Sequence, residues 1–420
     1  MAAVAQDLNM LGAGLLAALH AQAPRQLVAG AAGGTFVSPA SIGLALLLLL
    51  NGAREGSPVH RQLSDALAAP SGGACAGADG VTRQYEELLR QLDAAAAQSA
   101  GADPPAAPAG AGGGGGAGGG GGGEPPVVLS VATSVWARPP LRFQEGYAAV
   151  LRGRLRASAR ELAGAAPVNE WVSQETRGRI ADLLDEAAVA RAVAVLVSAV
   201  YFKGAWASPF DAARTAAAPF TRSDGSEVLA AMMFKKFTAG QALFTHEEGQ
   251  FQGVRLPYKG GHFAATALLP AAGAPGGARA LLARAAREPG LLGGLRWARG
   301  EALVWLPRFK LEARASLKGA LQQVGVTAPF QPSRDFSAML EGESDLVVDD
   351  VIHKVFIEVN EKGTEAAAAT AAVMMRTAMP LRPPPEMRFD RPFMFGVQHV
   401  ESGAFLFLGV VDQPDAWKTG

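Results

Sequence analysis

Residue types that could perform catalysis are present in this chain, but not in the spacings that catalysis needs. A hydrolase requires an activated nucleophile with a base within reach. The sequence has no Gly-x-Ser-x-Gly turn, and its one cysteine, Cys75, has no neighbouring histidine or basic residue. His246-Glu247-Glu248 lacks the second histidine of a zinc-binding helix, and the six histidines are too scattered for a metal site. The sequence therefore predicts a protein that is not an enzyme and that uses no metal and no cofactor.

Two further groups of residues suggest ligands only at first sight. The glycine tract within residues 101–126 has no Lys-Ser or Lys-Thr after it, so it is not a phosphate-binding loop. Four arginines lie between Leu151 and Arg160, where a solvated helix face or strand end is a better interpretation than a polyanion site. With a formal net charge of +0, the chain has no overall attraction for nucleic acid or acidic membranes. We expect neither as a partner.

The segment from Glu361 to Pro385 is ambiguous in a way that suggests a switch. Thr364 and Glu365 precede an alanine-rich run that has a high helix propensity. Residues 355–359 before it are β-branched and aromatic, as in a strand, and the prolines that follow it forbid a continuing helix. A segment between strands whose own preference does not settle one state is a candidate for conformational change.

This segment resembles the hinge of the reactive-centre loop of serpins, and in particular the inhibitory hinge of plant and algal members. The matching hinge residues are Glu361, Gly363, Thr364, Glu365, Ala366, Ala367, Ala368, Ala369 and Thr370. Phe389-x-x-Pro392-Phe393-x-Phe395 and Leu406-Phe407-Leu408-Gly409 are similar to the signature that follows this loop. The resemblance extends from Asp7 to Pro414, apart from the glycine-rich insertion.

The resemblance implies an α+β fold in a single domain over residues 1–420, with about nine helices around three β-sheets. It also implies an exposed hinge and reactive-centre loop at residues 361–383. Residues 101–126, which are rich in Gly, Ala and Pro, predict a disordered surface insertion. The patterns further predict helices at 168–184 and 278–295, one strand over 302–311, and hairpins turning at Asp224-Gly225 and Gly260-Gly261.

The N-terminal segment and the cysteine content bear on the compartment. One cysteine allows no internal disulfide, which fits a reducing compartment. The apolar N-terminal segment carries Asp7 and no basic residue before it, unlike a signal peptide. Five leucines share one helical face of this segment: Leu8, Leu11, Leu15, Leu16 and Leu19. We expect a retained first helix in an intracellular, cytoplasmic protein; an organelle or extracellular location stays open.

The resemblance also assigns supporting residues around the loop, namely Ser38, Ser41, Ser198, Trp206, Arg308 and His353. His353 resembles a buried histidine that bonds near Ser38, Ser41 or Ser198, although the family usually has asparagine at position 198. Trp206 and Arg308 match residues at the top of the main sheet, where Arg308 could pair with Glu361. Ordinary packing or a surface ion pair is the simpler alternative for these residues.

The function implied by the resemblance is that of a monomeric suicide-substrate inhibitor of an endopeptidase. In the usual register the target would cut Thr377-Ala378, which suits elastase-like serine proteases with a shallow pocket. One residue earlier, Arg376-Thr377 would suit trypsin-like serine proteases or arginine-specific cysteine proteases. The competing interpretation is a non-inhibitory serpin that acts as a binding or chaperone-like protein.

Overall fold

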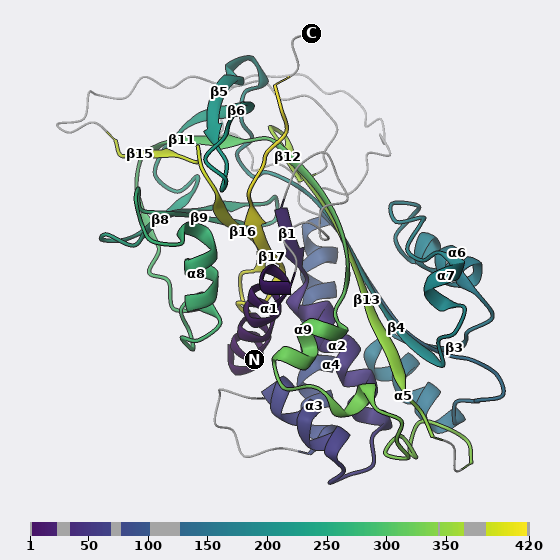
Figure 1. Cartoon of the computed structure of the whole chain (residues 1–420). Coiled ribbons are helices and arrows are strands. Elements are labelled where there is room, and N and C mark those ends of the chain that lie inside the picture. The colour runs from purple at the N-terminus through teal and green to yellow at the C-terminus, as the bar shows by residue number, and fades with distance from the viewer. Residues whose placement is uncertain are drawn as a thin grey trace, which may run out of the picture.

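The computed structural model describes residues 2–22, 34–68, 77–100, 127–342, 345–364 and 384–417. Within these ranges the chain forms nine α-helices and three β-sheets in a mixed α+β arrangement, as predicted (Figure 1). The insertion at 101–126 and the loop residues 365–383, with both alternative scissile bonds, lie outside the described residues. The expectations for those two segments therefore stay predictions.

The longest helices lie in the N-terminal part of the chain. The nine helices are α1 Ala2–Gln22, α2 Pro39–Gly52, α3 Pro58–Ala68, α4 Ala78–Ala100, α5 Glu145–Leu155, α6 Ala165–Glu175, α7 Glu186–Val189, α8 Gly277–Ala285 and α9 Lys318–Gln323. The five leucines predicted on one face of α1 are all buried. Helix α2 begins at Pro39 because the Ser38 hydroxyl accepts a hydrogen bond from the Ser41 amide, which caps the helix.

Three sheets carry the strands. The seven-stranded sheet has the order β1 Gly34–Val37, β17 Phe405–Val411, β16 Phe393–His399, β9 Phe263–Pro270, β8 Phe251–Pro257, β7 Leu243–Glu247 and β10 Ala298–Arg299. The four-stranded sheet has β15 Glu386–Arg388, β11 Ala302–Pro307, β6 Glu227–Phe237 and β5 Ala216–Thr221. The central six-stranded sheet has β12 Phe309–Ser316, β13 Val348–Asn360, β14 Gly363–Thr364, β4 Ala194–Ala205, β2 Val127–Ala137 and β3 Ser158–Glu161.

Both faces of the central sheet are covered, which explains why its strands are apolar almost throughout. Helix α2 packs against β2 and β4 on one face, and α6 packs on the other (Figure 1). Beyond α6, Ile180 and Leu183 join a second apolar cluster with Val197 of β4 and Ile352 of β13. The segment after α6 therefore lies over the line where β4 meets β13.

Two predicted helices are shorter than expected. The predicted helix at 168–184 ends at Glu175, because Gly178 takes a positive φ and the Asn169 side chain accepts from the amides of Leu183 and Leu184. The predicted helix at 278–295 ends at Ala285, shortly before Pro289, which disfavours helix at the residue before it.

The predicted single strand over 302–311 is in fact two strands in different sheets. β11 belongs to the four-stranded sheet and β12 to the central sheet, and the chain changes sheets at Pro307-Arg308. At this crossing the Arg308 amide donates to Ala231 O. Both predicted hairpins are confirmed, as β5–β6 and β8–β9.

Candidate functional site at the hinge and the sheet seam

The hinge enters the central sheet as a two-residue strand, β14. Gly363 pairs with Asn360 on one side and with Ala205 on the other, and Thr364 pairs with Val359 and Gly204. Both pairings are antiparallel, and both residues of β14 are buried. β14 therefore lies between the carboxyl ends of β4 and β13.

Beyond β14, β4 and β13 are parallel neighbours with no strand between them. Their register runs from Ala194 opposite Val348 to Tyr201 opposite Phe356. We call this line of contact the seam. The two antiparallel residues of β14 thus lie at one end of the seam, just beyond the parallel pairing of the two strands.

Glycine is required at position 363 because the backbone of β4 passes very close. A Cβ at this position would lie 2.0 Å from the carbonyl oxygen of Gly204 and 2.7 Å from the Cα of Ala205. Gly363 also has a φ of +155°, which side-chain-bearing residues rarely adopt. Any other residue would displace the hinge from its place between the strands.

Thr364 is fixed by an aromatic pair beneath it. Its hydroxyl shares a 2.6 Å hydrogen bond with the Tyr258 hydroxyl, and the Trp206 ring stacks on the Tyr258 ring with centroids 4.6 Å apart. The Trp206 indole donates to Asn360 O at 2.9 Å. Burial raises the pKa of the Tyr258 hydroxyl well above its ordinary value, so this group remains a neutral hydrogen-bonding partner. Trp206 thus directly follows the carboxyl end of β4, which is the top of the central sheet, as predicted.

The predicted pair between Arg308 and Glu361 is confirmed. Arg308 Nε donates to Glu361 Oε1 at 2.6 Å, and a second guanidinium nitrogen contacts the same oxygen. The Thr215 hydroxyl also donates to it, and the Phe210 amide donates to the Glu361 carbonyl oxygen. Glu361 is only 5% exposed, so its charge depends on these donors. The pair anchors the hinge two residues before Gly363.

His353 joins the two strands of the seam to α2. The Ser38 amide donates to His353 Nε2 at 2.9 Å, so the ring proton lies on Nδ1. Nδ1 is 3.0 Å from Ser198 Oγ and 3.1 Å from Ser198 O on the opposite strand. The hydroxyls of Ser198 and Ser41 are 2.6 Å apart. His353 therefore bonds Ser38 and Ser198, as predicted, and each of these two serines bonds Ser41.

Burial sets the charge state of His353. The residue is 1% exposed, and burial lowers the pKa of its imidazole from 6.5 to about 4. The ring is therefore neutral at physiological pH, as an acceptor at Nε2 must be. Serine at position 198 still completes the network where asparagine is usual in the family, because its hydroxyl can bond both His353 and Ser41.

Two contributors were not predicted as site residues. Tyr258 and Thr215 lie far from the hinge in sequence, and neither has a charge or a motif that marks it as a partner of Thr364 or Glu361. Their position depends on how the ends of β8 and β5 meet the central sheet. A tyrosine directly after the strand Phe251–Pro257 is the only local signal that could have suggested one of them.

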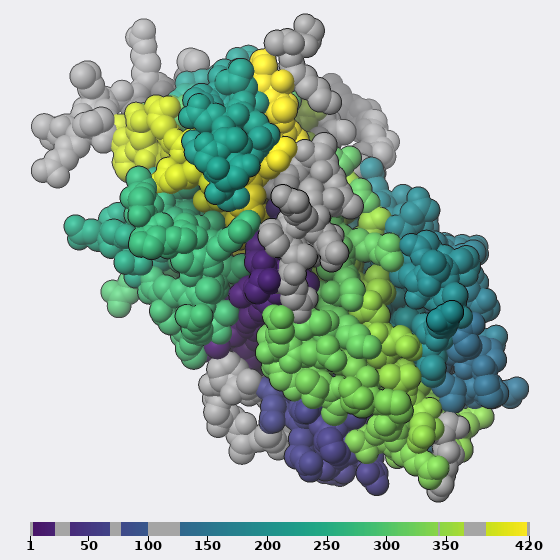
Figure 2. Space-filling model, in the orientation of Figure 1, coloured from purple at the N-terminus to yellow at the C-terminus, as the bar shows by residue number. Residues whose placement is uncertain are grey.

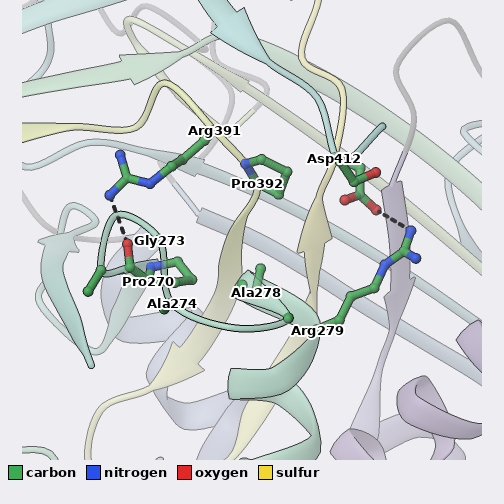
Figure 3. Close-up of a pocket in the computed structure, with 12 residues that line it drawn as sticks. Pro270, Gly273, Ala274, Ala278, Arg279, Arg391, Pro392 and Asp412 are labelled. Atoms are coloured by element: carbon green, nitrogen blue, oxygen red, sulfur yellow. Dashed lines mark hydrogen bonds and ion pairs between the residues drawn. The ribbon is translucent and has the colours of Figure 1, made fainter. Parts of the chain in front are cut away.

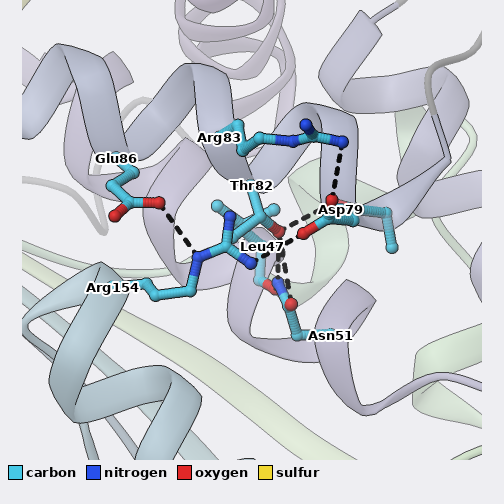
Figure 4. Close-up of polar contacts among 8 residues, drawn as sticks. Leu47, Asn51, Asp79, Thr82, Arg83, Glu86 and Arg154 are labelled. Carbon is cyan, nitrogen blue, oxygen red and sulfur yellow. Dashed lines mark hydrogen bonds and ion pairs between the residues drawn. The ribbon is translucent and has the colours of Figure 1, made fainter.

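The arginines between Leu151 and Arg160 are occupied by acidic or aromatic partners. Figure 4 shows Arg154 reaching Glu86 and Asp79 of α4, the latter at 2.7 Å. Arg152 pairs with Glu145, Arg156 pairs with Asp93, and Arg160 lies over the rings of Trp136 and Trp171. These contacts favour the interpretation of a helix face and a strand end over that of a polyanion site.

A pocket at the start of α8 contains none of the predicted site residues. It is lined by Arg391, which donates to Pro270 O at 2.8 Å, and by an Arg279–Asp412 pair 3.5 Å apart (Figure 3). In the ranges that the structure describes, no three His, Cys, Asp or Glu side chains are grouped as a metal site. In the same ranges, no helix is both long and apolar enough to cross a membrane.

The fold and the hinge define a mixed α+β protein whose central sheet holds the two-residue strand β14 between the ends of two parallel strands. A family model described as "Serpin (serine protease inhibitor)" matches residues 15–414, and the chain belongs to this family.

Three curated relatives illustrate the similarity. Plasminogen activator inhibitor 1 of Bos taurus is 36% identical over 251 residues, which cover 59% of this chain and 61% of the relative. Leukocyte elastase inhibitor of Homo sapiens is 34% identical over 262 residues, which cover 59% of this chain and 65% of the relative. Antitrypsin of Bombyx mori is 31% identical, with 68% of this chain and 73% of the relative covered. The match thus spans less than two thirds of the first two relatives.

Solved structures support the fold alone. An Arabidopsis serpin in its native stressed conformation superposes with a TM-score of 0.75 at 24% identity, covering 98% of both chains. Thyroxine-binding globulin in complex with thyroxine also gives 0.75, at 20% identity, over 97% of this chain and 99% of that one. The relatives and structures include mammalian, insect and plant proteins, so the plant and algal detail of the hinge stays a prediction.

Proposed function

We propose that this protein is an inhibitory serpin that traps an endopeptidase as a covalent acyl-enzyme. The target would cut the loop 365–383, and the cleaved loop would then enter the central sheet between β4 and β13. The observation that carries the proposal is β14, whose two residues already pair with both strands of the seam. A chain that served only as a passive linker would not need this position.

The register of β14 can be continued along the seam without a shift. Thr364 pairs with Gly204 and Val359, so Thr370 would pair with Ser198 and His353, which already face each other. Antiparallel partners point to the same face of a sheet. Thr364, Ala366, Ala368, Thr370 and Ala372 would therefore point to the core on the α2 side. Glu365 would point to the other face, beside Lys203 and Glu358.

The energetics favour insertion of small residues. Insertion would remove the row of backbone hydrogen bonds between β4 and β13, and it would create two rows, one from the inserted strand to each of them. The net gain is therefore about one row of backbone hydrogen bonds. For about ten backbone hydrogen bonds at roughly 0.5–1.5 kcal/mol each, the gain is on the order of 10 kcal/mol. The alanine-rich run has no proline that would interrupt the ladder and no large side chain that would catch at the opening. The uninserted fold would then persist through its kinetic barrier.

The bonds of His353 and of Glu361 would contribute to that barrier. His353 bonds β4 to β13 in the middle of the seam, and the Arg308–Glu361 pair holds the hinge at the end of the seam where β14 lies. Insertion must break the bonds of His353 that join β4 to β13, and it must turn the chain that follows the Arg308–Glu361 pair. Both contacts stabilise the protein before cleavage, and neither is needed afterwards.

The target class follows from the loop sequence. Cleavage at Thr377-Ala378 would suit an elastase-like enzyme, and cleavage at Arg376-Thr377 would suit a trypsin-like or arginine-specific enzyme. The names leukocyte elastase inhibitor and antitrypsin among the relatives support both alternatives. We further propose a monomer that acts inside the cell.

The test is incubation with one elastase and one trypsin. We expect a band of protein plus protease that survives denaturation, together with a released C-terminal peptide. The mass of this peptide identifies the scissile bond, because cleavage after Arg376 and after Thr377 gives peptides that differ by one threonine. Complete cleavage by both enzymes without a stable complex would favour the non-inhibitory binding or chaperone-like alternative.

A further inference from the structure

An alternating row of cations and aromatic rings lies on the outer face of the four-stranded sheet. The Arg214 guanidinium carbon is 4.2 Å from the centroid of the Phe234 ring, and the Phe234 and Trp305 centroids are 4.6 Å apart. The Arg388 guanidinium carbon is 3.9 Å from the Trp305 centroid. The rings are half-buried, whereas both arginines are exposed. We call these four residues the cation–aromatic row.

The strand register builds this row. Trp305 of β11 is paired with Phe234 of β6 on one side and with Arg388 of β15 on the other, so all three side chains share one face. Arg214 is the last residue of the 3₁₀ turn Ala212–Arg214, which is separated from β5 by Thr215. β5, β6, β11 and β15 lie together at one end of the molecule, and Figure 2 shows the surfaces of β15 and β5–β6 beside each other.

The row connects the two points where the loop joins the described structure. Arg214 immediately precedes Thr215, whose hydroxyl donates to Glu361 in the hinge. Arg388 lies four residues after Pro384, where the described chain resumes beyond the loop. A catalytic domain of ordinary size is about 40 Å across. A protease of this size that holds the loop between these two points is large enough to contact the row.

The row carries an excess of positive charge. Arg388 pairs with Glu386 at 3.0 Å, and the adjacent Lys236 pairs with Glu301 at 3.0 Å. Arg214 has no ion pair with another residue in the part of the chain that the structure describes. Stacking on the rings orients the guanidinium groups before any partner arrives, which reduces the entropy lost on contact. Such exposed charges mainly raise the association rate of an oppositely charged partner.

We propose that the cation–aromatic row is a docking surface for an acidic face of the target protease. The proposal rests on the proposed inhibitory function, since it is the loop that brings the protease to the row. It adds a selection step to the loop sequence: among proteases that can cut the same bond, the row favours those with a negatively charged surface beside the active site.

The test uses two trypsins of the same specificity and opposite net charge, an anionic and a cationic form. We compare wild type with the double variant Arg214→Glu/Arg388→Glu, and measure the second-order rate constant of loop cleavage at low salt. We expect the double variant to lose about tenfold or more with anionic trypsin and to lose nothing with cationic trypsin. The difference should shrink at high salt because exposed charges are screened.

Two further variants separate charge from folding. Arg214→Lys/Arg388→Lys keeps both charges and should keep most of the rate with anionic trypsin. Arg191→Glu, which reverses one charge where the double variant reverses two, is the control for a charge change away from the row, because Arg191 is an exposed arginine just before β4, at the end of that strand opposite to β14. A misfolded variant would slow both trypsins, so the ratio of the two rates is the decisive measurement.

The outcomes distinguish this proposal from the function on which it rests. If Arg214→Glu/Arg388→Glu gives the same ratio of rates as Arg191→Glu while covalent complexes still form, the docking surface is wrong and the inhibitory function stands. If the loop is cut without any covalent complex, the inhibitory function is wrong. A charge-dependent ratio in that second case would still support docking of the protease on the row.

Discussion

The burial of His353 predicts that the seam is sensitive to pH. Its imidazole is neutral because Nε2 must accept from the Ser38 amide while Nδ1 bonds Ser198. The pKa is about 4 in the folded protein, against 6.5 for an exposed histidine. Between these values the unfolded chain binds a proton that the folded chain does not. The stability that depends on neutral His353 is therefore fully present above pH 6.5 and is lost as the pH falls through about 4.

We predict a pH-dependent difference between wild type and His353→Asn. The shift is worth roughly 3 kcal/mol between pH 7 and pH 4. As the pH is lowered, the urea concentration at the midpoint of the first unfolding transition should decrease more steeply in wild type than in the variant. The reason is that the variant has no imidazole to protonate at this position. The difference between the urea midpoints of the two proteins should accordingly become smaller as the pH approaches 4. Parallel curves over this range would show that another group governs the seam.

In an inserted strand, successive side chains of the hinge would point to opposite faces of the central sheet. Two substitutions at neighbouring residues test this alternation. Ala368→Glu would put a carboxylate toward the core, opposite Val200 and Val355. Ala367→Glu would put it on the other face, opposite Tyr201 and Phe356. Over these two rings lie the cations of Arg179 and Lys310.

We predict that Ala368→Glu turns the protein from an inhibitor into a substrate, whereas Ala367→Glu largely remains an inhibitor. An unpaired carboxylate in an apolar interior costs several kcal/mol, enough to slow insertion relative to hydrolysis of the acyl-enzyme. The measurement is the number of inhibitor molecules consumed for each protease molecule trapped. Equal values for the two variants would mean that the register of β14 does not continue into the inserted strand.

The elements themselves were more predictable than their meeting points. Local signals sufficed for the hairpins at Asp224-Gly225 and Gly260-Gly261, since turn chemistry acts within a few residues. The strand expected over 302–311 was wrong because an apolar pattern cannot indicate that Pro307-Arg308 crosses between sheets. Likewise Gly363 and Glu361 were found from the hinge motif, while Tyr258 and Thr215 required the packed sheets to bring them there.

At the scale of the whole molecule, a stored difference in free energy should appear as heat resistance. If cleavage lets the alanine-rich run add a ladder, the gain is on the order of 10 kcal/mol. Spread over the unfolding entropy of a chain of 420 residues, this raises the melting temperature by on the order of 10 °C. The increase should follow a cut anywhere between the end of the alanine-rich run and Pro384, since such a cut leaves the run attached to β14 and free to move.

Calorimetry of intact and loop-cleaved protein measures this increase directly. Cleaved Ala368→Glu is the matched control, because its loop is equally nicked but would place a charge in the core on insertion, so its melting temperature should rise much less. Wild type that melts at the same temperature before and after cleavage would contradict the proposal. In that case the intact sheet would already hold all the stability available to it, and no driving force would remain to displace a bound protease.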